Sequence, residues 1–255
     1  MKRYAIVSKK DDVSRHLAAL IKDELKELIY DEEHPDIVIS VGGDGTMIYS
    51  IHRYEHVLND VSFVGIHTGT LGFFTDYLKD EYKQLVKDIL TKEPEIFDRH
   101  LLRISYNGEI FHALNEMRIE NSHRSQVIDM YVNDEHMETF RGNGLCVSTP
   151  SGSTALNKSL GGAVINPSLR LMQVTEIAGI HHNAYRSLGS PLILGDEDVV
   201  RFETDFNENA VLGIDTDIFE LKDHDVIEAR LSKRVAHFCD YRHISFVKRL
   251  RKSYL

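Results

Sequence analysis

The chain has 255 residues, of which 42% are hydrophobic and 27% charged, a composition typical of a soluble globular protein with one large domain or two ordinary ones. Thirty Lys and Arg against forty Asp and Glu give a formal net charge of -10, which argues against nucleic acid or an anionic membrane as the main partner. No apolar run approaches the length of a membrane span, and MKRYAIVSKK is too poor in apolar residues for a signal peptide. We therefore expect a cytoplasmic protein that binds neither nucleic acid nor membrane.

The first hundred residues alternate short apolar runs with amphipathic segments. Strands are predicted at 4–7, 36–41 and 62–67, and helices at 12–29, 46–57 and 80–92. The inward stripe predicted for the first helix consists of Val13, Leu17, Leu20, Ile21, Leu25 and Leu28. Continuously apolar strands that alternate with helices indicate a parallel sheet covered on both faces. An α/β domain with a parallel sheet is predicted over residues 1–97.

From about Phe97 the pattern becomes that of an antiparallel β-rich, sandwich-like domain, predicted over residues 98–240. Two strand-like runs flank Asn107 and Gly108, the dipeptide that most favours a type I′ hairpin turn. A second hairpin is predicted at 127–140, and further alternating segments lie at 199–206, 219–231 and 234–241. The small polar residues of 149–167 suit a short helix. Residues 241–255 form a basic segment that can be helical and pack back on the first domain.

Cys146 and Cys239 are the only cysteines of the chain. They lie far apart without CxxC spacing, so two reduced thiols are predicted in preference to a disulfide or a metal site.

The run IVISVGGDGTMIY at 37–49 carries the clearest chemical signal. Three glycines around Asp44 leave backbone amides bare where a helix begins, which favours the binding of phosphate oxygens. The GxxxxGK[ST] and GxGxxG patterns are both absent. Because Asp44 would repel phosphate, it more plausibly handles a proton or a metal-bound water. The alternative is a surface turn in which Asp44 caps the following helix.

Five segments together resemble the signatures of bacterial NAD kinases in order and spacing. They are ISVGGDGT at 39–46, HTGTLGF at 67–73, LNE at 114–116, GLCVSTPSGSTA at 144–155 and the following SLGGAVINP, within a likeness that spans about residues 37 to 220. Diacylglycerol, sphingosine and 6-phosphofructokinases carry turns related to GGDGT, whereas STPSGSTA combined with LNE and LGF is much more specific. The resemblance implies a two-domain enzyme with an α/β nucleotide-binding half and a β-rich half, assembled as a dimer or tetramer. It implies transfer of the γ-phosphoryl group of ATP to the adenosine ribose 2′-hydroxyl of NAD.

The resemblance also implies roles for individual residues. Asp44 becomes the proton acceptor for the ribose hydroxyl, and the phosphate-binding residues become Gly42, Gly43, Gly45 and Thr46. The implied NAD-binding residues are Asp44, Gly45, Phe73, Asn115, Glu116, Arg141, Asn143, Thr154, Ala155, Leu156, Asn157, Lys158, Ser159 and Ala178, the last as a contribution across a subunit interface. Mg²⁺ or another divalent cation would arrive with ATP, so no dedicated protein metal ligands are expected.

Two positions depart from the family pattern. Relatives commonly have Asp at the position of Asn143 and Tyr at the position of Leu156. Asn143 loses a negative charge, and Leu156 loses an aromatic ring and a hydroxyl. These changes predict weaker NAD affinity rather than a different reaction.

Plainer interpretations exist for several of these features. Phe73 alone would be an ordinary core aromatic, LNE a solvated strand end and KRLRK near the C-terminus a solvated helix face. The pair His181 and His182 lacks metal-site spacing, whereas His67 is predicted to lie near the active cleft.

Two rival function classes are a lipid or sugar kinase of the same superfamily and a non-catalytic NAD or NADP sensor. The polar STPSGSTALNKS suits a dinucleotide better than a lipid, and the intact Asp44 and glycines argue against a sensor. These motifs do not distinguish ATP from polyphosphate as donor, NAD from NADH as acceptor, or a dimer from a tetramer, and they leave feedback by NADP open.

Overall fold

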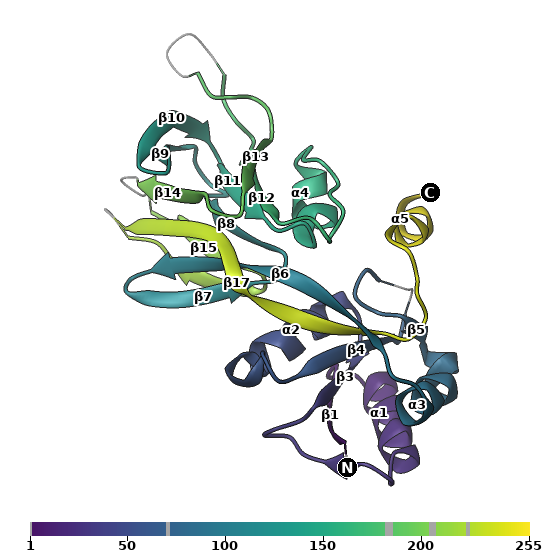
Figure 1. Cartoon of the computed structure of the whole chain (residues 1–255). Coiled ribbons are helices and arrows are strands. Elements are labelled where there is room, and N and C mark those ends of the chain that lie inside the picture. Colours follow the sequence, from purple (N-terminus) through teal and green to yellow (C-terminus); the bar gives the residue numbers. More distant parts are fainter. Residues whose placement is uncertain (1, 70–71, 182–185, 204–207, 223–224) are drawn as a thin grey trace. The chain divides into compact units, whose positions relative to one another are not determined.

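The computed structural model describes residues 2–69, 72–181, 186–203, 208–222 and 225–255 (Figure 1). The chain forms two compact units. Unit 1 comprises Met1–Arg99 and Val235–Leu255, and unit 2 comprises His100–Arg234. Two long strands, β6 and β17, each contribute residues to both units. Among the described residues, no helix has the length and apolar character that crossing a membrane requires.

Unit 1 is built on a parallel sheet with the strand order β2-β1-β3-β4-β17, and β5 pairs with β4. Its strands are β1 (Arg3–Ser8), β2 (Ile29–Tyr30), β3 (Ile37–Gly42), β4 (Ser62–His67), β5 (Tyr77–Leu78) and the last part of β17 (Val226–Asp240). Every residue of β3 is buried, as its unbroken apolar run requires of a central strand.

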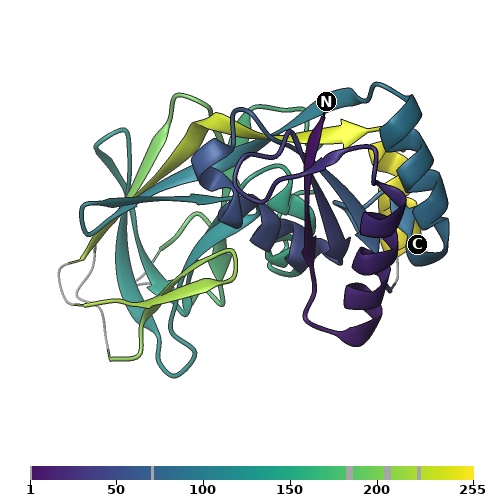
Figure 2. The ribbon, with the colours of Figure 1, turned by 90° about the horizontal axis from the view of Figure 1, so that it is seen from below.

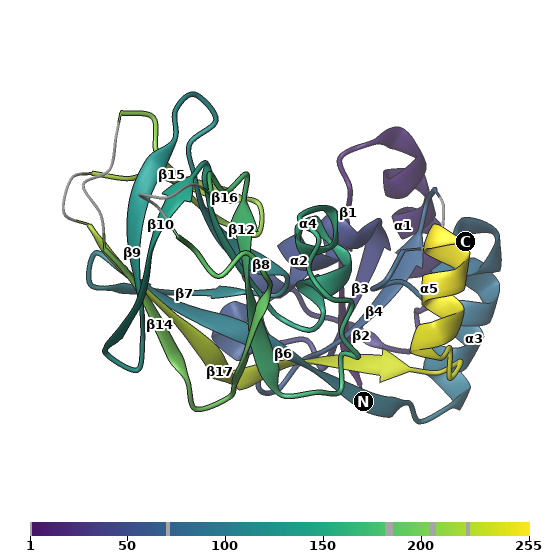
Figure 3. The same ribbon diagram turned by 90° about the horizontal axis from the view of Figure 1, so that it is seen from above.

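Helices cover both faces of this sheet, as Figures 2 and 3 show. They are α1 (Asp12–Glu24), α2 (Asp44–Arg53), α3 (Tyr82–Thr91), α5 (Phe246–Tyr254) and the 3-10 turns η1 (Glu55–Val57) and η2 (Lys79–Glu81). α1 and α3 pack side by side, and Leu17, Ile21, Leu85 and Ile89 join the strands in one core. α2 lies on the other face.

The first helix differs from its prediction at both ends. It stops at Glu24 rather than 29, because Ile29 leaves to pair with Arg3 in the sheet and its amide donates to the carbonyl of Lys2 at 3.2 Å. Val13 was predicted to face inward but is 55% exposed. It belongs to the first turn of α1, which borders a cavity instead of the core.

Unit 2 is a sandwich of two antiparallel sheets. One has the order β10-β9-β14-β17, with β6 paired to β17 and β7, and the other has the order β13-β12-β11-β8-β15-β16. The strands of the first are β6 (Glu95–Tyr106), β7 (Glu109–Ala113), β9 (Gln126–Val132), β10 (Glu135–Gly142), β14 (Val199–Glu203) and the first part of β17. Those of the second are β8 (Glu116–Glu120), β11 (Gly144–Ser148), β12 (Leu171–Ile177), β13 (Leu192–Gly195), β15 (Val211–Ile214) and β16 (Asp217–Glu220). Side chains of both sheets share one core.

The predicted hairpins and fold class are confirmed. Asn107 and Gly108 have φ of 50° and 77°, and Asn133 and Asp134 have φ of 51° and 66°, so each turn places two consecutive residues at positive φ as a type I′ turn requires. The short helix predicted within 149–167 is present as η3 (Gly152–Thr154) and α4 (Leu156–Ser159). Cys146 and Cys239 are buried free thiols.

Four predicted segments of the β-rich part are described in more detail by the structure. The two runs expected around the first hairpin are three strands, because β8 follows β7 after a short break. The segments 219–231 and 234–241 are joined by the single long strand β17. The strand predicted at 199–206 is β14 as far as Glu203, and 204–206 lie outside the described residues.

Candidate active site

The GGDGT turn of unit 1 links β3 directly to α2. Gly43 is the N-cap of α2, and its carbonyl accepts hydrogen bonds from the amides of Thr46 at 3.0 Å and Met47 at 3.1 Å. A side chain at Gly42 would place its Cβ 2.2 Å from Oγ1 of Thr46, so glycine is required there for the close approach of strand and helix. At Gly45 no atom lies within 4 Å of such a Cβ, so this face of the turn is open.

Asp44 does not cap the helix, contrary to the alternative that the sequence left open. It is the first residue of α2, and its carboxylate accepts hydrogen bonds from the amides of Phe73 at 2.8 Å and Phe74 at 3.0 Å. Gly72 allows this approach, because a Cβ there would lie 2.2 Å from Oδ1 of Asp44. Two donors therefore orient the carboxylate, while each oxygen keeps acceptor capacity.

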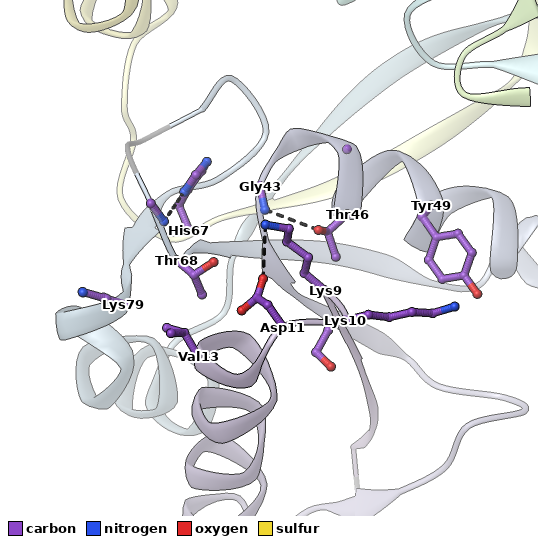
Figure 4. A pocket seen from close by; sticks show the side chains of 13 residues that line it. Lys9, Lys10, Asp11, Val13, Gly43, Thr46, Tyr49, His67, Thr68 and Lys79 are labelled. Atoms are coloured by element: carbon purple, nitrogen blue, oxygen red, sulfur yellow. Dashed lines mark hydrogen bonds and ion pairs between the residues drawn. The ribbon is translucent and has the colours of Figure 1, made fainter.

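A cavity of about 700 Å³ opens beside the GGDGT turn within unit 1 (Figure 4). Its lining comprises Ser8, Lys9, Lys10, Asp11, Val13, Gly43, Gly45, Thr46, Tyr49, His67, Thr68, Gly69 and Lys79. Three lysines and the N-terminus of α2 make it suitable for an anion. One lysine, Lys9, pairs with Asp11 at 3.2 Å.

The sequence interpretation missed these lysines. Lys9 and Lys10 directly follow β1, and parallel strands present their carboxyl ends at one edge of a sheet. The sequence could have revealed Lys9 and Lys10, because they follow the first predicted strand and therefore lie at the same edge of the sheet as GGDGT.

His67 ends β4 and lines the cavity, in agreement with its predicted place near the cleft. Its Nδ1 accepts a hydrogen bond from the amide of Gly69 at 2.8 Å, so the proton of the neutral ring resides on Nε2. Burial lowers the pKa of His67, although the nearby charge of Asp44 acts in the opposite direction. A neutral imidazole with an Nε2–H donor therefore lies over Gly43, where a Cβ would be 3.1 Å from Nε2.

Asn115 and Glu116 lie at the start of β8 in unit 2, held by the carboxylate of Asp215. That carboxylate accepts the amides of Leu114 at 2.7 Å, Asn115 at 2.8 Å and Glu116 at 3.3 Å. The sequence interpretation did not identify Asp215, whose role becomes visible only when β15 is paired with β8.

Three buried polar atoms at this end of β8 and β11 have no hydrogen-bond partner among the described residues. They are Oδ1 of Asn115, Oε2 of Glu116 and Oγ of Ser148. Ser148 is paired with Glu116 across the two strands, so the atoms belong to one locality. An orphan acceptor of this kind is costly unless a ligand or water donates to it.

Glu116 is 7% exposed, and its surroundings disfavour the charged form. Burial, and then the charge of Asp215, raise the pKa of Glu116 to about 7, while Arg118 acts in the opposite direction. A hydroxyl or amine donor placed against Oε2 would stabilise the ionised carboxylate.

The segment after β11 packs directly against Asn115. A Cβ on Gly152 would lie 2.0 Å from the carbonyl oxygen of Asn115, and the amide of Thr149 donates to that oxygen at 2.9 Å. Thr154 is buried, Ala155 and Leu156 are half-buried, and Lys158 and Ser159 are exposed.

Asn157 serves the fold of this segment. Its Nδ2 donates to the carbonyls of Ser153 and Ala163 at 3.2 Å each, and its Oδ1 accepts from Oγ1 of Thr175 at 2.7 Å. Both polar atoms of the Asn157 side chain are thus bonded within the protein. Its contribution to a ligand site would be to hold the loop 153–163 in place.

Arg141, Asn143 and Ala178 gather at the opposite end of β11. The amide of Asn143 donates to Ile177 at 3.0 Å, and the carbonyl of Arg141 accepts from Ile180 at 2.8 Å. Asn143 and Thr149 flank β11, so at about 3.3 Å per residue the two ends are roughly 20 Å apart. One chain therefore does not bring these residues to Asn115.

Phe73 lies half-buried beside the C-terminal helix of unit 1. Its ring and that of Tyr254 have centroids 5.6 Å apart at an angle of 37°. Thr70 and Leu71 of the segment HTGTLGF lie outside the described residues, as does His182. Within the described part of the chain, no three His, Cys, Asp or Glu side chains come together as a metal site would require.

Comparison with solved structures defines the class of the fold. Yeast NADH kinase in complex with NADH superposes with a TM-score of 0.85 at 18% identity, covering 99% of this chain and 87% of that chain. An NAD kinase from Archaeoglobus fulgidus in complex with ATP gives 0.76 at 23% identity, covering 99% and 97%. The two-unit fold is thus that of NAD and NADH kinases.

Sequence comparison places the chain within this class. Residues 3–94 match the ATP-NAD kinase N-terminal domain, and residues 114–240 match the ATP-NAD kinase C-terminal domain. NAD kinases of Staphylococcus aureus strains JH9 and Newman are each 41% identical over 263 aligned positions, covering 99% of this chain and 97% of theirs. The chain belongs to the ATP-NAD kinase family and is a kinase that acts on NAD.

Proposed function

We propose that this protein transfers the γ-phosphoryl group of ATP to the 2′-hydroxyl of the adenosine ribose of NAD and releases NADP and ADP. The hydroxyl oxygen attacks the γ-phosphorus, the bond from that phosphorus to the bridging oxygen breaks, and the hydroxyl proton passes to the carboxylate of Asp44. The observation that carries this proposal is the orientation of that carboxylate by the amides of Phe73 and Phe74. Positioning and charge neutralisation supply most of the catalysis in such transfers.

The lysine-bearing cavity is the proposed binding region for the triphosphate. Gly43, Gly45 and Thr46 lie in its wall at the start of α2, and Lys10 and Lys79 supply positive charge. Gly42 is not part of the cavity lining, and its role is to allow the turn to pack closely against Thr46. With a triphosphate in the cavity, the neutral ring of His67 would donate a hydrogen bond from Nε2 to a phosphate oxygen.

Mg²⁺ is expected to enter with ATP. Because the described residues offer no cluster of three metal-ligating side chains, the phosphate oxygens would hold most of its coordination sphere. The ion would neutralise charge on the phosphates, and the protein's own residues would bind, orient and accept the proton.

Asn115 and Glu116 are the proposed anchors of the adenosine of NAD. Their unpartnered oxygens are acceptors, and the adenine amino group and ribose hydroxyls are donors. Thr154, Ala155, Leu156 and Ser159 would close over the same group. A lipid would leave these buried oxygens unsatisfied, which disfavours the rival function of lipid kinase.

Self-association to a dimer or tetramer is part of the proposal. Arg141, Asn143 and Ala178 are assigned to NAD binding, yet they lie roughly 20 Å along the strand direction from Asn115. In this proposal, Arg141, Asn143 and Ala178 of a second copy of the chain lie beside Asn115 of the first copy.

The test is incubation with ATP, Mg²⁺ and NAD, followed by enzymatic detection of NADP. Asp44→Asn should lower kcat by at least about a hundredfold while NAD binding, measured by calorimetry, persists. Asp60→Asn, an exposed carboxylate outside the site, serves as the control. Parallel reactions with polyphosphate and with NADH identify the donor and acceptor. Normal NADP formation by the Asp44 variant would remove this residue from the reaction.

A further inference from the structure

The segment 73–76, whose amides bind Asp44, is itself bound by side chains of the C-terminal segment. Phe73 and Phe74 direct their amides to Asp44, and the Thr75–Asp76 peptide unit that follows in the same segment is bound at both of its polar ends. The carbonyl of Thr75 accepts from Nη1 of Arg249 at 3.0 Å, and the amide of Asp76 donates to the carbonyl of Gly65 at 3.0 Å. The peptide plane between Thr75 and Asp76 is thereby fixed between a sheet strand and a side chain.

Arg249 makes a second contact with the same segment. Its Nη2 forms an ion pair with the carboxylate of Asp76, and both side chains are largely buried. The carbonyl of Asp76 also accepts from Arg242 at 3.0 Å. Residues 73–76 thus bind Asp44 on one side and cationic side chains from the C-terminal segment on the other.

The one buried residue of α5 is charged. It is Arg249, at 8% exposure, while Phe246 and Leu250 are half-buried and Val247 is 64% exposed. The sequence interpretation of KRLRK as a solvated helix face is therefore wrong for Arg249. A buried ion pair contributes little net stability compared with apolar side chains of similar volume, because desolvation of both charges offsets their attraction.

Tyr254 gives α5 a second point of attachment to this segment. Its ring packs on Phe73, two residues before Thr75, whose carbonyl Arg249 binds. Both contacts of α5 therefore fall on the short stretch that carries the two amide donors to Asp44.

We propose that Arg249 is a positioning residue, which fixes residues 73–76 from α5 so that their amides hold the Asp44 carboxylate in the geometry for accepting the ribose proton. This inference rests on the function proposed for Asp44. Movement of the Thr75–Asp76 peptide would shift the preceding residues Phe73 and Phe74 and tilt their amides, and proton transfer tolerates little misplacement of its acceptor.

The test compares Arg249→Met and Arg249→Lys with Arg251→Met, an exposed position on the same helix. Arg249→Met should lower kcat about tenfold to a hundredfold, because misplacement of a reacting group costs on this scale. KM for NAD and for ATP should stay within about twofold, since Arg249 is not assigned to substrate. Arg249→Lys keeps one donor for Thr75 and should recover part of the loss, while Arg251→Met should behave as wild type. An unchanged kcat in folded Arg249→Met, checked by circular dichroism and urea unfolding, overturns the proposal.

A double variant separates positioning from a general structural role. In the Asp44→Asn background, Arg249→Met should lower the residual kcat no further, because its effect passes through Asp44. If the fold-loss in kcat of the double variant equals the product of the fold-losses of the two single variants, the proposal is overturned. If Asp44→Asn alone retains wild-type turnover, the function proposed for Asp44 fails; if it is impaired while Arg249→Met is not, only this inference fails. Should Arg249→Met not fold, Arg249→Lys carries the same comparison.

Discussion

The carboxylate of Asp44 is oriented before any substrate arrives, because two consecutive amides bind its two oxygens. Gly42 and Gly72 permit the close packing around it, whereas Gly45 adjoins open space. The glycines of the GGDGT and LGF segments therefore have separable tasks. Some allow the turn to form, and others leave room for a ligand.

Substitution of these glycines should separate the two tasks. Gly45→Ala meets no atom within 4 Å, so we expect unfolding free energy to change by less than about 1 kcal/mol while KM for ATP rises severalfold through crowding of the phosphates. Gly42→Ala puts a Cβ 2.2 Å from Oγ1 of Thr46 and should destabilise the fold by about 1–3 kcal/mol. Urea unfolding and initial-rate kinetics measure both quantities. Loss of stability in Gly45→Ala with unchanged ATP saturation would contradict the assignment.

Glu116 should make NAD binding depend on pH. Its pKa of about 7 in the folded protein exceeds the ordinary 4.5, so between these values the native state retains a proton that the unfolded chain has lost. This group's contribution to stability is therefore greatest at low pH and is lost as pH rises through about 7. Donors on the ribose favour the ionised form, so NAD affinity should strengthen about tenfold from about pH 6 to about pH 8.

Calorimetric titration of NAD at several pH values measures this dependence. Glu116→Gln removes the titrating group and should give a flat profile over the same range. A profile as steep in Glu116→Gln as in the wild type would assign the dependence to another group.

At the scale of elements, the sequence predicted what local patterns determine. The buried run of β3 and the Asn107–Gly108 turn are specified by neighbours in the chain, and both are present. The end of α1 was missed because pairing of Ile29 with Arg3 overrides the helical pattern. The support of Asp44 by Phe73 was equally invisible, because it joins residues far apart in the sequence.

Asn143 stands where the family resemblance predicts Asp, and its contacts favour the amide. Its Nδ2 donates to the carbonyl of Asn121 at 2.7 Å, and the Asn143 carbonyl accepts from the Asn121 amide at 2.8 Å. A carboxylate cannot donate to that carbonyl. Restoring the residue common in relatives would therefore set two acceptors against each other.

Asn143→Asp should accordingly lower the free energy of unfolding by about 1–3 kcal/mol, the scale of a lost partner at a partly buried acceptor. Urea unfolding at neutral pH measures the loss. Asn59→Asp, at an exposed loop position, is the control for an added charge and should change stability by less than about 0.5 kcal/mol. Equal stability of Asn143→Asp and wild type would mean that the bond to Asn121 contributes nothing.

At the scale of the whole molecule, the two sets of proposed NAD-binding residues pose a geometric problem. Asn115 lies beyond one end of β11, and Arg141 and Ala178 lie beyond the other. Antiparallel pairing on both sides of β11 keeps these ends apart. Both sets are proposed to bind NAD, and one chain keeps them roughly 20 Å apart, so the proposal takes the second set from another copy.

Mixed oligomers test this requirement. Asn115→Ala and Arg141→Ala should each weaken NAD use in homogeneous assemblies, because either change damages every site. In a heterodimer of the two, one site combines both substitutions and the other combines the intact Asn115 of one copy with the intact Arg141 of its neighbour. Coexpression with two different tags and tandem purification isolates this species, which should recover about half of the wild-type activity per dimer at low NAD. A matched heterodimer of two differently tagged Asn115→Ala chains controls for the tags and should recover none. If the verified mixed heterodimer is no more active than its parents, Arg141 does not act in a neighbouring site, and the self-association proposed for NAD binding fails.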